Sequence, residues 1–193
     1  MSQAQARDDI VFRNMALGAP NVQARLSPAQ VSTALGQGNG AETLGLPAGV
    51  QLDDVLSYLR VFKHSDERDG HWELFITTVA NVTIKIDLTE HQYRMLFNAA
   101  PRPTDKSTTS VPLVAQFRQV GTTVRQAIAA IVTVATEMGP RTGTDDYNCQ
   151  DFTVRFMAAL GVGFTDSLKF ALRREILKNH ENIATSGALP DGF

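Results

Sequence analysis

The sequence contains a single cysteine, Cys149, among its 193 residues. One cysteine excludes a disulfide within the chain and a structural zinc site built on cysteine pairs, and it suits a reducing compartment. No apolar run approaches the roughly 20 residues that span a membrane, and residues 1–9 contain no apolar segment of signal-peptide length. We therefore expect a protein that is cytoplasmic, or exported without a cleaved signal peptide.

An excess of charge of one sign is also absent. The chain has 18 basic and 20 acidic residues, no block of basic residues, and only 7% aromatics. A surface that follows nucleic-acid phosphates needs clustered cations, so we expect no nucleic-acid partner and no membrane insertion. The 43% hydrophobic content is enough to bury a core, and it favours one main domain with elaborations over two independent domains.

The first third of the chain is rich in small residues and helical in pattern. Helices are predicted near residues 9–17 and 27–35, and the second has Pro28 at its first position. The glycines of residues 36–40 indicate a flexible connector. We expect residues 1–50 to form a helical extension and residues 51–193 to form the main domain. Helical spacing returns over residues 52–62.

After these residues, apolar side chains recur at every second position, which is typical of strands. Residues 72–76 and 82–88 alternate in this way and predict a β-hairpin that turns at Ala80-Asn81. Further along the chain, the pattern predicts a short helix from Thr89 to Ala99, a strand or helix over residues 111–120, a helix over residues 123–138 and a last helix over residues 167–179.

The stretch Tyr147-Asn148-Cys149-Gln150-Asp151-Phe152 places the cysteine in the first turn of a predicted helix that ends at Gly161. Unpaired N–H groups and the helix dipole stabilise a thiolate at that position, and the thiolate is the nucleophilic form. The alternative is that Cys149 is a small buried apolar residue.

A cysteine nucleophile needs a base, which is usually histidine. Of the four histidines, His71 begins a predicted strand, and a strand end fixes a side chain firmly. The others lie in a polar turn, in a predicted helix cap and near the C-terminus: His64, His91 and His180.

A strand-opening His followed much later by Asn-Cys-x-x-Phe at a helix start resembles the circularly permuted papain-like cysteine hydrolases. This group includes the lecithin–retinol acyltransferase-like proteins and the PPPDE isopeptidases, and it is related to the NlpC-type peptidases. The matching residues are His71, Asn148, Cys149 and Phe152, whereas Asp151 stands where these families often have a histidine. The resemblance covers about residues 70–161.

The resemblance implies that Cys149 is the nucleophile and His71 the general base. It also implies a third group on the strand next to that of His71. Asp87 is the best candidate because a carboxylate orients imidazole and stabilises imidazolium, with Thr83 as an alternative. The oxyanion would be met by the N–H of Cys149 and a neighbour, with Tyr147 or Asn148 as possible contributors.

These inferences combine into an α+β fold, with a small antiparallel sheet packed on helices as a permuted papain-like core. The expected activity is hydrolysis of a peptide, protein or amide substrate, with no cofactor. Three alternatives stay open: a thioester acyltransferase, a non-catalytic interaction domain with a buried Cys149, and a metal site of His64, His71 and Asp69.

Overall fold

The computed structural model describes residues 8–20, 23–64, 72–89, 92–99, 110–117, 121–139 and 149–162, without the side chains of residues 63, 64 and 110–117. Within these residues the chain forms seven strands and four helices. The strands are β1 (Ile10–Asn14), β2 (Gln23–Leu26), β3 (Leu56–His64), β4 (Trp72–Thr78), β5 (Thr83–Leu88), β6 (Tyr93–Phe97) and β7 (Ser110–Phe117). The helices are α1 (Pro28–Leu35), α2 (Gly40–Thr43), α3 (Val124–Met138) and α4 (Cys149–Ala159).

All seven described strands belong to one sheet, in the order β2-β1-β6-β5-β4-β3-β7. Every neighbouring pair is antiparallel except β1 and β6, which run parallel. The sheet is therefore mixed, whereas the sequence led us to expect a small antiparallel one. The fold class, α+β, is confirmed.

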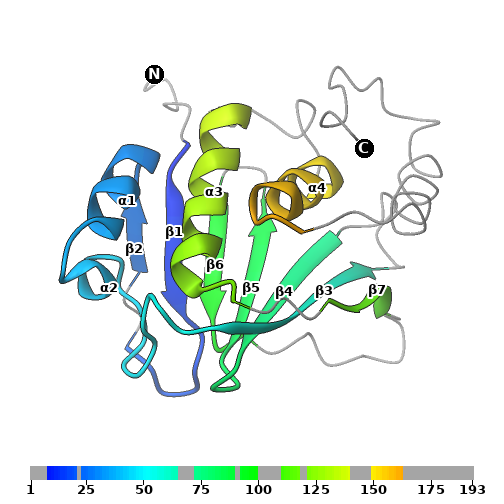
Figure 1. The fold of residues 1–193 in the computed structure, drawn as a ribbon, viewed down its shortest axis with the longest axis horizontal. Coiled ribbons are helices and arrows are strands. Elements are labelled where there is room, and N and C mark those ends of the chain that lie inside the picture. Colours follow the sequence, from blue (N-terminus) through cyan, green and yellow to red (C-terminus); the bar gives the residue numbers. More distant parts are fainter. Residues whose placement is uncertain are drawn as a thin grey trace, which may run out of the picture.

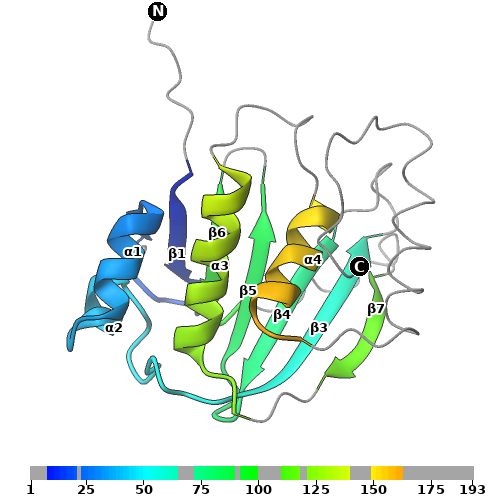
Figure 2. The same ribbon diagram turned by 45° about the horizontal axis from the view of Figure 1, so that its top comes forward.

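One face of the sheet is covered by α1, α3 and α4, as Figures 1 and 2 show. Alternate strand residues point into the core beneath these helices, among them Trp72, Leu74 and Ile76 of β4. Helix α3 contributes Ile128 and Ile131 to the same core. We call this the helix face. None of the described helices is long and apolar enough to cross a membrane.

The intervening strand residues lie on the opposite face. A small second cluster there contains Phe75, Leu96 and Ala99, with Phe62 packed edge-on against Phe75. Glu73, Lys85 and Asp87 share this face, because each alternates with residues of the helix face. The two faces of the sheet are thus chemically different.

Several predicted elements are confirmed. The hairpin is formed by β4 and β5, with Asn81 at a φ of 64° in its turn. Helix α1 has the predicted start, with Ser27 and Gln30 in a capping box. Helix α3 begins with a capping box of Thr123 and Gln126, and it spans nearly the predicted residues.

The helix predicted over residues 9–17 is wrong, because Ile10–Asn14 forms β1. Strand β1 lies between β2 and β6, and Ile10 and Phe12 enter the helix-face core while Val11 is buried on the other face. A short strand buried on both faces shows no alternation, so its pattern does not separate strand from helix. The described part of residues 1–50 is therefore no helical extension, since it supplies two strands and two helices to the shared fold.

The helix predicted over residues 52–62 is also wrong, because this segment contains most of β3. A bulge between Leu56 and Tyr58 shifts the pairing with β4, and the hydroxyl of Ser57 donates to the carbonyl oxygen of Thr77 at 3.0 Å. The bulge places Leu56 and Leu59, three residues apart, on the same face. A bulged strand thus imitates helical spacing.

The short helix predicted from Thr89 to Ala99 is wrong as well. Its described part is a turn, in which the N–H of Thr89 donates to the carbonyl of Gln92 at 3.0 Å, followed by β6. The ambiguous segment, residues 111–120, forms the edge strand β7 up to Phe117. The helix predicted over residues 167–179 lies outside the described residues.

We expect Gly40→Ala to destabilise the fold. A Cβ at Gly40 would lie 2.2 Å from the carbonyl oxygen of Ala34, and backbone at that distance has to move. The predicted loss is about 1–3 kcal/mol of unfolding free energy in urea denaturation, as for other overpacked sites. Gly38→Ala is the matched control, because nothing lies within 4 Å of a Cβ there. Equal losses for the two variants would contradict the prediction.

Candidate active site

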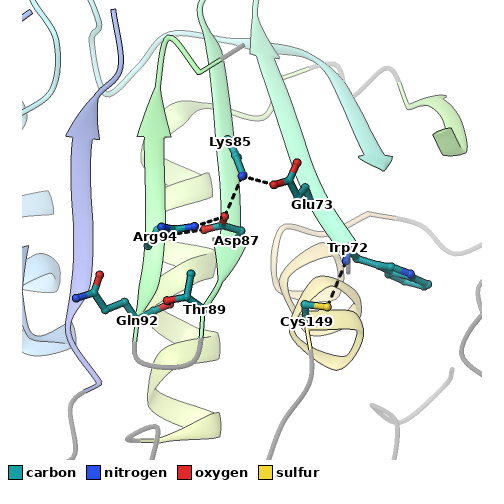
Figure 3. A network of polar contacts seen from close by, with 8 residues as sticks. All are labelled: Trp72, Glu73, Lys85, Asp87, Thr89, Gln92, Arg94 and Cys149. Atoms are coloured by element: carbon teal, nitrogen blue, oxygen red, sulfur yellow. Dashed lines mark hydrogen bonds and ion pairs between the residues drawn. The ribbon is translucent and has the colours of Figure 1, made fainter. Parts of the chain in front are cut away.

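Cys149 is the first residue of α4, and its side chain is half-buried against the beginning of β4. The backbone N–H of Trp72 donates a hydrogen bond to Sγ of Cys149 at 3.2 Å (Figure 3). The peptide bond that carries this N–H joins Trp72 to His71. The sulfur of the only cysteine therefore contacts the peptide group that follows His71.

The ladder between β4 and β5 explains why this N–H needs sulfur as its acceptor. The paired residues run from Leu74, opposite Ile86, to Thr77, opposite Thr83. Trp72 lies beyond the end of that ladder, and its side chain is fully buried. A buried N–H without an acceptor is costly, so the contact with Cys149 stabilises the fold as well as placing the thiol.

Aromatic packing places α4 on the sheet. Phe152 lies 5.9 Å, between ring centroids, from Tyr93 of β6 and 6.2 Å from Phe156 of the same helix. The hydroxyl of Tyr93 donates to the carbonyl oxygen of Gly139, at the end of α3, at 2.8 Å. Asp151 accepts a hydrogen bond from Nε of Arg155, one turn further along α4, at 3.0 Å.

On the opposite face of the sheet, four buried or half-buried ionic side chains form a row, which we call the charge chain: Glu73, Lys85, Asp87 and Arg94 (Figure 3). Nζ of Lys85 contacts Oε1 of Glu73 and lies 3.1 Å from Oδ2 of Asp87. Arg94 donates to both carboxylate oxygens of Asp87, at 2.7 and 2.6 Å. The charge chain thus crosses β4, β5 and β6.

The charge chain keeps Asp87 ionised. Burial acts to raise the pKa of Asp87, but the hydrogen bond from Arg94 and the charges of Lys85 and Arg94 outweigh it, so the pKa is lowered from its ordinary value of 3.8. The same contact with Asp87 raises the pKa of Arg94. Three donors occupy the carboxylate, which has about four acceptor positions, so Oδ1 keeps capacity for one more donor.

Four buried polar atoms have no hydrogen-bond partner among the described residues: Nε of Arg13, Nε of Arg60, Nε1 of Trp72 and Oε1 of Gln150. Trp72 supplies the donor to Cys149, and Gln150 follows Cys149 in α4.

The structure brings together only part of the site predicted from the sequence. Cys149 lies at the helix start, as predicted, and touches β4. The carboxylate of Asp87 is bound by Arg94 and Lys85 on the face opposite α4, and Thr83 is half-buried at the other end of β5. His71, Tyr147 and Asn148 lie outside the described residues.

The alternative metal site falls largely on the same undescribed part. Its proposed ligands include the side chain of His64, together with Asp69 and His71, and none of these is described. Within the described residues, no group of three or more His, Cys, Asp or Glu side chains is arranged to hold a metal ion.

The sequence analysis missed Lys85 and Arg94. The only signal for Lys85 was the alternation of charged and apolar residues in β5, where Lys85 and Asp87 interrupt Ile84, Ile86 and Leu88. That pattern is also expected of a strand with one solvated face. Arg94 gave no signal, because its strand was taken for a helix.

Comparisons with protein-family models, with curated proteins and with solved structures found no match.

The lowered pKa of Asp87 predicts a pH dependence of stability. A carboxyl whose folded pKa lies below its unfolded value contributes stability above about pH 4, and this contribution is lost as the pH falls through the folded pKa. Asp87→Asn removes the contribution at every pH. The difference in unfolding free energy between parent and variant is therefore expected to shrink as the pH falls from 6 to 2. A difference independent of pH in urea titrations would contradict the role of this carboxylate.

Proposed function

We propose that this protein is a cysteine hydrolase that cleaves an amide, peptide or isopeptide bond, with Cys149 as the nucleophile and His71 as the general base. The observation that carries the proposal is the 3.2 Å hydrogen bond from the N–H of the His71–Trp72 peptide bond to Sγ of Cys149. It supports the proposal because the thiol contacts the backbone N–H of the residue that follows His71 in the chain.

The position of the sulfur favours the thiolate. The first residue of a helix lies at the positive end of the dipole, and a hydrogen-bond donor aimed at sulfur stabilises the charged form over the neutral one. Both effects lower the pKa of a thiol and raise the fraction present as nucleophile. Neither of these two effects depends on the side chain of His71.

Asp87 fits the role of the third group. The pairing of Phe75 with Lys85, extended along both strands, sets Asp87 opposite Glu73, close to the beginning of β4. Since His71 directly precedes β4 in the chain, we propose Asp87 as the group that orients its imidazole. An ionised Asp87 with one acceptor position left on Oδ1 suits an imidazole N–H.

In the proposed reaction, the thiolate attacks the substrate carbonyl carbon and forms a tetrahedral oxyanion. The C–N bond then breaks, and the leaving amine takes a proton from the imidazolium of His71. A water molecule, deprotonated by His71, hydrolyses the thioester and releases the carboxylic acid with the Cys149 thiol. Asp87 stays ionised and stabilises the imidazolium throughout.

Alkylation by iodoacetamide tests the nucleophile directly, because the chain has only one cysteine. The rate of alkylation followed against pH is expected to have its midpoint below neutrality, at about 4–7, compared with about 8.5 for an unperturbed thiol. His71→Ala is expected to raise the midpoint, since loss of a neighbouring imidazolium disfavours the thiolate.

A midpoint near 8.5 in the parent protein, or one that does not change in His71→Ala, would contradict the proposed pair of Cys149 and His71. It would favour the interaction domain. His180→Ala is the matched control for the loss of a histidine, and it is expected to leave the midpoint unchanged, because the proposed mechanism gives His180 no role. If ester or acyl-transfer activity alone accompanied a low midpoint, the enzyme would be the acyltransferase instead.

Two substitutions of Cys149 separate its chemical role from its structural one. Cys149→Ser keeps an acceptor for the N–H of Trp72, whereas Cys149→Ala leaves that buried donor unpaired. Both are expected to abolish hydrolysis of a peptide-amide library. Urea denaturation is expected to show Ala about 1–3 kcal/mol less stable than Ser. Retained turnover in either variant would exclude Cys149 as the nucleophile.

A further inference from the structure

We propose that Arg13, Arg25 and Arg94 form a binding site for a phosphate monoester on the face of the sheet opposite the helices. We call these three residues the arginine site. They come from β1, β2 and β6, which are distant in sequence but lie next to one another in the sheet (Figure 1). The arginine site lies across the sheet from α4, and it does not depend on the proposed function.

The register of the strands places the three arginines around Val11. Val11 pairs with Arg25 of β2 on one side and with Arg94 of β6 on the other. Residues directly opposite in neighbouring strands share a face, and so do residues two positions apart in one strand, so Arg13 belongs to the same group. Val11 is buried but lies outside the helix-face core, which assigns the group to the opposite face.

The spacing of these positions suits one small ligand. Arg25 and Arg94 lie on strands about 10 Å apart, twice the usual distance between neighbouring strands, and Arg13 lies about 7 Å from Val11 along β1. The side chain of Val11 is much shorter than an arginine side chain. Three guanidinium groups can therefore contact the same ligand above Val11.

The arginine site has two positive charges without a described counter-charge. The side chains of Arg13 and Arg25 form no hydrogen bond or ion pair within the described part of the chain, and Nε of Arg13 is buried in that state. The acidic residues that precede β1, Asp8 and Asp9, form no ion pair with them there. Only Arg94 has an acidic partner, which is Asp87 of the charge chain.

The three side chains also have donors that a ligand can reach. Arg25 is exposed, Arg13 is half-buried, and the side chain of Arg94 is 30% exposed. Arg94 uses Nε and Nη2 to bind Asp87, which fixes the guanidinium plane and leaves Nη1 for another acceptor (Figure 3). A guanidinium group offers paired N–H donors that match the oxygens of a phosphate.

The charge and the arrangement favour a phosphate monoester over other anions. A monoester carries a charge of about −1.5 to −2 at pH 7 and has three terminal oxygens, whereas a carboxylate has a single charge and two oxygens. The monoester therefore balances the two surplus charges and offers one oxygen to each arginine. A nucleic-acid backbone needs cations that follow many phosphates, whereas these arginines surround one point.

Calorimetric titration with inorganic phosphate, at constant ionic strength, tests the arginine site. The parent protein is expected to bind phosphate, and Arg25→Gln to bind it about tenfold more weakly, the factor that one charge-assisted hydrogen bond supplies. Arg25 is exposed, so this variant is expected to keep the parent fold. Arg25→Lys, which keeps the charge but not the paired donors, is expected to lie between the two.

Arg60→Gln is the matched control. Arg60 also has a buried, unpaired Nε, and it lies on the same face because it pairs with Phe75, but β6, β5 and β4 separate β3 from β1. Its replacement removes the same charge and is expected to leave phosphate binding unchanged. An equal loss in Arg60→Gln and Arg25→Gln would mean that only the net charge matters, and would overturn the proposal. Equal affinity for acetate, or no saturation by phosphate at about 10 mM, would overturn it as well.

A second titration identifies the source of the phosphate. Vesicles of phosphatidylcholine with and without phosphatidic acid present the same monoester as a lipid headgroup. Binding of inorganic phosphate alone supports a soluble ligand, whereas added binding to the vesicles with phosphatidic acid, lost in Arg25→Gln, supports a lipid headgroup at the arginine site. The pH midpoint of Cys149 alkylation is expected to be the same in Arg25→Gln and in the parent, so failure of the arginine site leaves the proposed function untouched.

Discussion

The backbone N–H of Trp72, at the beginning of β4, needs a hydrogen-bond acceptor. The geometry of the rest of the site depends on which group accepts this hydrogen bond. Trp72 lies past the last residue of β4 that pairs with β5, so β5 supplies no acceptor for its N–H at the described register. Sulfur takes the place of a carbonyl oxygen. For this to happen α4 must begin at Cys149, and its first turn must lie on the end of the sheet. The packing of Phe152 against Tyr93 and Phe156 fixes the helix there.

The sheet separates two kinds of chemistry. On the helix face, apolar strand residues meet α1, α3 and α4 in one core, and the order of packing is set by side-chain shape. On the opposite face, the charge chain crosses three strands. Its ionic contacts fix the positions of these side chains, and each buried charge depends on its partner. Cys149 and Trp72 meet on the helix face, where Cys149 packs, half-buried, against the core.

The sequence was sufficient where a single physical rule governs a segment. Alternation in residues 72–76 and 82–88 predicts the hairpin, Ser27-Pro28 predicts the start of α1, and apolar spacing predicts α3. The sequence was insufficient where two different structures produce the same pattern of residues. The bulge at Ser57 produces helical spacing in a strand, and Thr89 and Gln92, which have the residue types of a capping box, form a turn between strands. For the site, the motif located Cys149 at a helix start. The ionic contacts of Lys85 and Arg94 depend on which residues of β4, β5 and β6 lie opposite one another, and the sequence does not show this.

The parallel pairing of β1 with β6 has a consequence for how the protein reaches its folded state. Ile10 pairs with Tyr93, about 80 residues further along the chain, while β3, β4 and β5 each pair with the next strand in the sequence. Contacts between distant residues carry a larger entropic cost of loop closure and form later. During synthesis, β1 can therefore pair only with β2 until β6 has been made. The antiparallel strands around the Cys149 contact assemble as one local unit, and the N-terminal strand completes the sheet by docking onto a surface that is already formed.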